Sequence, residues 1–115
     1  MTQENNLLKI VIDALNDAKA LDINEYDVTN LTSIADYMVI ASGRSNRQVS
    51  AIADKVTQQA KAKGFMPLGE EGRKEGEWVL VDLGDVIVHI MHPETRDYYQ
   101  LEKLWHDTEK KLERK

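Results

Sequence analysis

The sequence predicts an α/β domain in which a small mixed β-sheet is flanked by helices. Two segments repeat apolar residues with helical spacing, one short segment between them is apolar on both faces, and a later segment has the pattern of a β-hairpin. With 115 residues, 42% of them hydrophobic, the chain can bury one core. We therefore expect a single domain over residues 1–115, with about 109–115 as a solvated tail.

The first helix is expected over about residues 5–20. Its apolar residues form one stripe, which Leu8 and Ile12 widen. The stripe consists of Leu7, Val11, Ala14, Leu15 and Ala18. A helix with such a stripe can pack against one face of a sheet.

A central strand is expected next. The stretch INEYDVTNL is a weak strand candidate, and it leads into a stronger strand that Gly43 ends. Both faces of the stronger strand are apolar, with Tyr37, Val39 and Ala41 on one and Met38 and Ile40 on the other. A strand that is apolar on both faces belongs in the middle of a sheet.

The second amphipathic helix is expected to begin after Ser45. Ser45 can cap the helix, and Gln48 completes a capping-box pattern. Apolar residues then recur at helical spacing up to Gly64, namely Val49, Ile52, Ala53, Val56 and Ala60. The glycine-rich stretch from Gly64 to Trp78 is predicted to be a connection, with a short strand at Met66–Leu68.

The segment EWVLVDLGDVIVHIMH predicts a hairpin that turns at Gly84-Asp85. Pro93 can then open a final helix. The apolar stripe of this helix comprises Tyr98, Leu101, Trp105, Thr108 and Leu112.

Composition excludes several classes of protein. The chain has no cysteine, so it has no disulfide scaffold and no thiolate chemistry, which fits a cytoplasmic protein. A net charge of -5 argues against broad binding to nucleic acid and matches a basic protein surface better. The start MTQENNLLKI lacks the features of a secretory signal, and no apolar run has the length needed to cross a bilayer.

Two carboxylates and two histidines in the hairpin segment suggest a metal site, but their spacing opposes it. Carboxylates that share a metal on a strand need even spacing, whereas Asp82 and Asp85 are three residues apart. We expect Asp85 to satisfy backbone groups of the turn. His89, His92 and the distant His106 do not form a zinc-binding pattern, so no metal and no cofactor is expected.

One candidate anion site precedes the second helix. In SGRSNRQ, a strand, a glycine and a helix start that carries Arg44 and Arg47 would suit a phosphate, a carboxylate or RNA. An ordinary capped turn with two solvated arginines explains the same residues.

The predicted turn assigns the hairpin residues to two faces. One face pairs only apolar residues: Leu83 with Val86, Val81 with Val88, and Val79 with Ile90. The opposite face carries Asp82 with Ile87, Leu80 with His89, and Trp78 with Met91. This mixture of an aromatic, aliphatic and polar residues is typical of a protein interface, although the last helix could also cover it through Trp105 and Tyr98.

Two long segments resemble the ribosomal silencing factor family, which is also called the iojap-like family. They are LTSIADYMVIASGRSNRQVSAIAD and GEWVLVDLGDVIVHIMHPETRDYYQLEKLW, and the similarity covers about residues 5–108. The resemblance implies a fold like that of nucleotidyltransferases without their active site, and therefore no enzyme. Nucleotidyltransferases carry a Gly-Ser pair at a helix start and an Asp-x-Asp on a strand. Here Gly43-Arg44-Ser45 keeps only the glycine, and the aspartates lack the even spacing.

The resemblance also implies a partner. Family members bind the large ribosomal subunit through ribosomal protein L-fourteen, block an intersubunit bridge, prevent the two subunits from joining and so repress translation. The residues we carry over to binding are Trp78, Leu80, Met91, Glu94, Tyr98 and Tyr99, with Arg44 and Arg47 as candidates for a minor contact with ribosomal RNA.

Two alternatives remain open at this point. One is a nucleotide-binding transferase with a phosphate site at Gly43–Arg47. The other is that the mixed face of the hairpin forms a homodimer when the protein is free.

Overall fold

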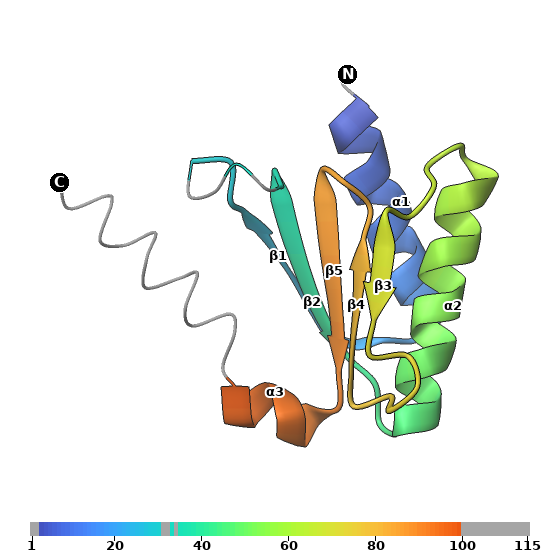
Figure 1. Ribbon diagram of the computed structural model, residues 1–115, viewed down its shortest axis with the longest axis vertical. Coiled ribbons are helices and arrows are strands. Elements are labelled where there is room, and N and C mark those ends of the chain that lie inside the picture. The colour runs from blue at the N-terminus through green and yellow to red at the C-terminus, as the bar shows by residue number, and fades with distance from the viewer. Residues whose placement is uncertain (1–2, 31–32, 34, 100–115) are drawn as a thin grey trace, which may run out of the picture.

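The computed structural model describes residues 3–30, 33 and 35–99, and these form a sheet with helices on one face and at one end (Figure 1). In chain order the elements are α1 (Gln3–Asp17), β1 (Leu21–Asp27), β2 (Tyr37–Ser42), α2 (Asn46–Ala62), β3 (Gly69–Glu71), β4 (Trp78–Asp82), β5 (Val86–Met91) and α3 (Pro93–Tyr99). The five strands lie in the order β1-β2-β5-β4-β3. Among these described strands, only β2 and β5 pair in parallel.

The main core lies between the helices and one face of the sheet. Figure 1 shows α1 and α2 side by side on that face. The predicted stripes of both helices point into this first cluster, although Ala18 lies beyond the end of α1 and is only partly buried. The first cluster contains Leu7, Val11, Ala14 and Leu15 of α1, Val49, Ile52, Ala53, Val56 and Ala60 of α2, and Val39, Ala41, Val79, Val81, Val88 and Ile90 of the sheet.

The opposite face of the sheet carries a smaller core. This second cluster consists of Val28, Ala35, Met38, Ile40, Ile87 and Met91, and Tyr26, Trp78 and Leu80 pack against it. Because β2 and β5 contribute to both clusters, they are buried on both faces. The predicted central position of the Tyr37–Ser42 strand is therefore confirmed.

The hairpin has the predicted register. Trp78 pairs with Met91, Leu80 with His89 and Asp82 with Ile87, so the two faces are those expected. Gly84 has φ +91° and the Leu83 N–H donates to the Val86 carbonyl at 3.0 Å, as in a two-residue turn with glycine at its first central position.

The expected role of Asp85 in this turn was wrong. The Asp82 carboxylate satisfies the turn, because its Oδ1 accepts from the Gly84 N–H at 2.9 Å. Asp85 is exposed, and its backbone carbonyl accepts from Asp36 and Tyr37 at 2.9 and 3.0 Å. Asp82 fills the role because it stands two residues before the N–H it must reach, the usual spacing for an aspartate in a turn.

Two further boundaries differ from the prediction. The short strand lies at Gly69–Glu71, not at Met66–Leu68, because it forms where the chain pairs with Leu80–Asp82 of β4. The first helix ends at Asp17, and Lys19 then adopts φ +61°. The last helix begins at Pro93 as predicted. Its expected continuation past Tyr99, the cover by Trp105 and the tail at 109–115 lie outside the described residues.

Candidate functional site

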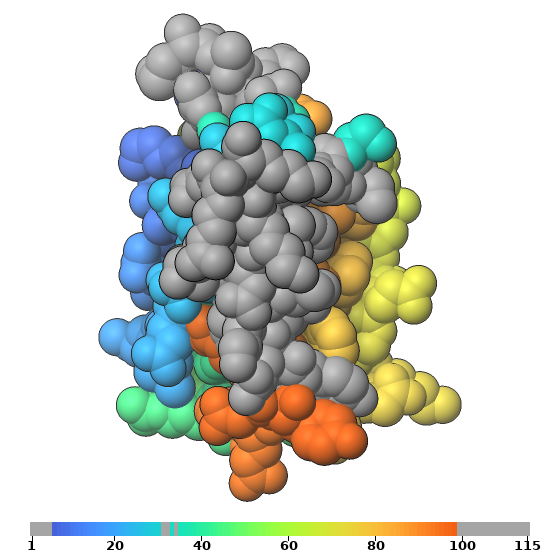
Figure 2. Space-filling model, turned by 90° about the vertical axis from the view of Figure 1, so that its left-hand side faces the viewer, coloured from blue at the N-terminus to red at the C-terminus, as the bar shows by residue number. Residues whose placement is uncertain are grey.

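The candidate site begins with Trp78 and Leu80, which lie on the face of the sheet opposite α1 and α2. Their neighbours Val79 and Val81 point into the first cluster, so the alternation of β4 turns Trp78 and Leu80 to the other side. Both side chains are half-buried. Figure 2 views the molecule from this side, with the segment around β3 along one edge (yellow) and α3 at the lower end (orange). A half-buried tryptophan near a sheet edge can contact both the core and a partner.

His89 fixes the position of Trp78. The Trp78 indole N–H donates to His89 Nδ1 at 2.9 Å, and the two rings are 5.8 Å apart. His89 itself is 5% exposed, and this burial lowers the pKa of the imidazole from 6.5 to about 4. The imidazole is therefore neutral at pH 7, which leaves Nδ1 free to accept the hydrogen bond.

An open hollow of about 500 Å³ lies beside these residues. Trp78 and Leu80 form an apolar wall of it, and Glu71, Gly72 and Glu75 also line it. Both glutamates are exposed. Sequence reasoning missed them, because it treated residues 64–78 only as a connection; the density of acidic residues next to the hairpin was the available signal.

Gly72 brings the loop of the hollow close to β4. Its φ is +85°, and a Cβ added there would lie 1.9 Å from the Trp78 carbonyl oxygen. Only glycine combines this conformation with such a close approach. The loop that carries Glu71 and Glu75 is therefore held directly against the strand that carries Trp78.

The other predicted binding residues are divided between the surface and the core. Glu94 and Tyr98 of α3 are exposed, Tyr98 by 80%. Met91 has no exposed surface and lies in the second cluster next to Trp78, its partner across the hairpin. The side chain of Tyr99, which ends α3, is outside the described part of the structure.

A buried arginine attaches α3 to the sheet, and sequence reasoning did not single it out. Arg96 is 8% exposed, and its Nη1 donates to the Asp22 carbonyl at 2.8 Å and to Ser42 Oγ at 2.9 Å. The His92 N–H also donates to the Glu77 carbonyl at 2.9 Å. These bonds hold α3 at the end of the sheet where Trp78 lies.

Comparisons with known proteins match this arrangement. A family model described as "Ribosomal silencing factor during starvation" matches residues 1–115. The chain belongs to the ribosomal silencing factor family. Ribosomal silencing factor RsfS of Chromobacterium violaceum is 52% identical over 97 residues, which cover 84% of this chain and 80% of that protein. The name of the family describes regulation at the ribosome, which is not a catalytic role.

A solved structure and a more distant relative extend the comparison. A crystal structure of a Chromobacterium violaceum protein superimposes with a TM-score of 0.89 at 48% identity, covering 92% of this chain and 88% of that one. The predicted mixed α/β fold is thereby confirmed. A mouse protein named "Mitochondrial assembly of ribosomal large subunit protein 1" is 34% identical over 101 residues, which cover 85% of this chain and 44% of that protein.

In this silencing-factor chain the aspartates and histidines are engaged separately. Asp82 bonds the turn, His89 Nδ1 accepts from Trp78, and His92 Nδ1 accepts from the Glu94 N–H at 3.4 Å. Within the described ranges, no group of three or more His, Cys, Asp or Glu side chains could hold a metal ion. His106 lies outside these ranges.

At the start of α2, the side chains of Ser45 and Gln48 already accept hydrogen bonds from backbone N–H groups. Ser45 Oγ accepts from the Gln48 N–H at 3.1 Å, and Gln48 Oε1 accepts from the Arg44 N–H at 2.6 Å. A Cβ on Gly43 would lie 2.9 Å from a Val49 methyl group, so the glycine serves packing. Arg44 and Arg47 are exposed. The geometry favours a capped turn over a phosphate site.

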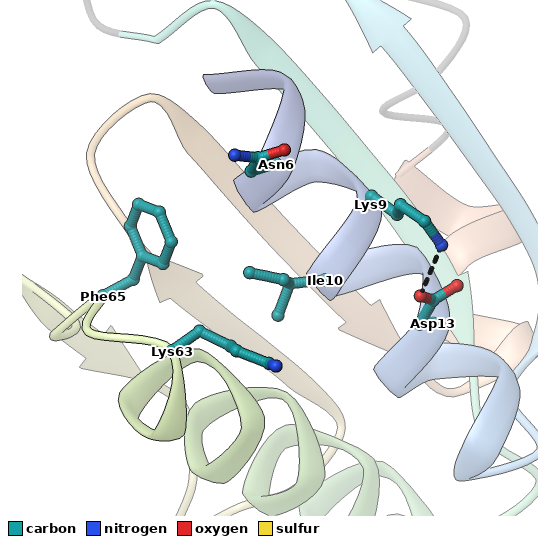
Figure 3. Close-up of a pocket in the computed structure, with 6 residues that line it drawn as sticks. All are labelled: Asn6, Lys9, Ile10, Asp13, Lys63 and Phe65. Atoms are coloured by element: carbon teal, nitrogen blue, oxygen red, sulfur yellow. Dashed lines mark hydrogen bonds and ion pairs between the residues drawn. The ribbon is translucent and has the colours of Figure 1, made fainter. Parts of the chain in front are cut away.

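A second open hollow, of about 470 Å³, lies on the helical side of this family member (Figure 3). Ile10 of α1 and Lys63, which follows α2, extend into the space between the two helices. Lys9 and Asp13 at its rim already form an ion pair at 2.9 Å. None of the residues predicted to bind a partner lines this hollow. In the part of the chain that the structure describes, the helices are too short or too polar to cross a membrane.

Proposed function

We propose that this protein binds the large ribosomal subunit through ribosomal protein L-fourteen and thereby keeps the small subunit from joining. The bound protein would occupy the site of an intersubunit bridge and repress translation in the cytoplasm by steric exclusion. Membership of the ribosomal silencing factor family supports this proposal. The name of the mouse relative, which refers to the large subunit, supports the choice of subunit.

The observation that carries the docking site is the half-buried pair Trp78 and Leu80 beside an acidic hollow. Protein interfaces commonly have an aromatic anchor, aliphatic neighbours and a polar rim. The net charge of -5 favours a basic partner protein over bare RNA. These properties together support a protein contact at this edge of the sheet.

The predicted binding residues take different roles in this proposal. Trp78 and Leu80 contact the partner directly, and the exposed Glu94 and Tyr98 extend the contact along α3. Met91 supports Trp78 from the core, since it has no exposed surface. Tyr99 is proposed to contact the partner on the basis of the family resemblance alone. The exposed Arg44 and Arg47 supply a minor contact with ribosomal RNA.

The test replaces Trp78 by alanine and measures binding to purified large subunits. We expect binding to weaken by about 2 kcal/mol or more, because a central aromatic anchor contributes that much to an interface. Leu68→Ala is the matched control, since Leu68 is 74% exposed and lies outside the proposed site. Circular dichroism of both variants establishes that they fold.

The silencing step is tested by sedimentation. Small and large subunits are mixed with and without the protein, and we expect saturating wild-type protein to lower the fraction of joined ribosomes. Trp78→Ala should require a correspondingly higher concentration. If the fraction of joined subunits is unchanged at saturating wild-type protein, the proposed function is wrong.

A further inference from the structure

We propose that the hollow lined by Glu71, Gly72, Glu75, Trp78 and Leu80 receives a lysine or arginine side chain of the protein partner. This inference rests on the proposed function and specifies the chemistry of the partner at one point of the docking site. The occupant is a basic segment of a folded protein, from which one long cationic side chain inserts.

The two glutamates of the hollow take part in no ion pair within the described residues. The arginine of the same loop, Arg73, is engaged elsewhere: its Nη1 donates to Glu70 Oε1 at 2.8 Å, and its Nη2 bonds Asp54 of α2. Glu71 and Glu75 form no ion pair in the described ranges, and the described lining of the hollow includes no cation. The two glutamates that line the hollow therefore have no ion-pair partner among the described residues.

The apolar wall suits the stem of a basic side chain. Trp78 and Leu80 both line the hollow, and the Trp78 N–H is directed to His89 Nδ1. A lysine or arginine has an aliphatic stem that packs on such surface and a cationic end that is attracted to an aromatic ring. An acidic side chain would meet the two carboxylates with like charge, and an apolar one would leave them uncompensated.

The geometry of the hollow is built into the loop. The left-handed conformation of Gly72 places the loop against the Trp78 carbonyl, and β3 pairs Glu71 with Leu80 of β4. The backbone that carries Glu71 and Glu75 is thus held next to Trp78 and Leu80 before a partner arrives. A volume of about 500 Å³ is ample for one long side chain.

The first experiment compares two double variants in binding to purified large subunits. Glu71→Gln with Glu75→Gln removes both carboxylates of the hollow and keeps the size of the side chains. Glu25→Gln with Asp85→Asn removes two exposed carboxylates elsewhere and gives the same net charge. We expect the hollow variant to bind at least ten-fold more weakly than the control, with a shallower dependence of affinity on salt. Equal affinity of the two variants overturns the inference while the proposed function stands.

The second experiment does not depend on the ribosome. An acetylated Gly-Arg-Gly amide and its Gly-Gln-Gly counterpart are titrated into ¹⁵N-labelled protein, and the indole N–H signal of Trp78 is followed by NMR. The variant Trp105→Phe assigns that signal. We expect a saturable shift with the arginine peptide that the Glu71→Gln, Glu75→Gln variant loses.

The two experiments separate the two claims. An arginine peptide that shifts the signal no more than the glutamine peptide contradicts the inference. If the arginine peptide binds but wild-type protein does not bind large subunits, the proposed function fails and the basic-side-chain pocket stands.

Discussion

At the scale of single residues, the buried imidazole of His89 makes the position of Trp78 depend on pH. His89 accepts the indole N–H only while its Nδ1 carries no proton. Protonation would place a charge in a site that is 5% exposed and would replace an acceptor by a second donor facing the indole. Acid therefore disfavours the folded arrangement that orients Trp78.

The pH dependence of stability follows from the pKa of His89. In the folded protein this pKa is about 4, against an ordinary value of 6.5, so between these two values the unfolded chain binds a proton that the folded chain does not. The stability that His89 contributes is complete above about pH 6.5 and declines by about 3 kcal/mol as the pH falls to about 4.

Denaturant unfolding at pH 7, 5.5 and 4.5 measures this decline. His89→Gln is the comparison, because glutamine keeps an acceptor for Trp78 but does not titrate. We expect the wild type to lose more stability with falling pH than the variant does. Parallel pH profiles for the two proteins would contradict the assigned role.

Only part of the candidate site could be predicted from the sequence. Trp78 and Leu80 follow from the turn at Gly84, because once the turn is placed the alternation of the strand assigns every side chain to a face. Alternation does not show how deeply a side chain is buried on its face of the sheet. Met91 was therefore expected at the surface, whereas it is fully buried. Arg96 was missed for the opposite reason, since charged residues are normally exposed and its burial depends on Ser42 and Asp22, which are distant in sequence.

At the scale of elements, the loop between β3 and β4 depends on one glycine. Gly72→Ala would place a Cβ 1.9 Å from the Trp78 carbonyl oxygen at a φ of +85°. We expect this variant to lose about 2 kcal/mol or more of unfolding free energy, because both the conformation and the contact oppose a side chain.

Gly69→Ala is the matched control for this prediction. It lies on β3, and a Cβ there meets no atom within 4 Å. Urea unfolding of the two variants under identical conditions gives the comparison. Equal stability of the two alanine variants would show that the loop can relax away from β4.

The elements differ in how well the sequence predicts them. The stripe of α2 and its Ser45 cap are local signals, and both appear as expected. The edge strand β3 carries no such signal, because its three residues are all exposed and have no alternation of apolar and polar side chains. Its position is determined by hydrogen bonding to β4, a contact that a pattern within one segment cannot reveal.

At the scale of the whole molecule, the two clusters share a single sheet. Since β2 and β5 contribute side chains to both, loss of either cluster exposes the same two strands. We therefore expect the residues that the structure describes to unfold as one cooperative unit.

Two probes that sense different clusters test this expectation. In a Trp105→Phe background, the fluorescence of Trp78 reports on the second cluster, and far-UV circular dichroism reports mainly on α1 and α2, which pack on the first. The two unfolding transitions should coincide. A Trp78 transition at lower denaturant would indicate that the second cluster unfolds separately.

The parallel pairing of β2 with β5 has a consequence for synthesis. β2 emerges early, but its parallel partner follows only after α2, β3 and β4 have been made. A nascent chain that stops before Val86 lacks β5, one of the two strands that contribute to both clusters, and it lacks the imidazole that orients Trp78. The docking surface proposed above therefore cannot form until nearly the whole described chain has been translated, and we expect an unfinished copy not to bind a ribosome through it.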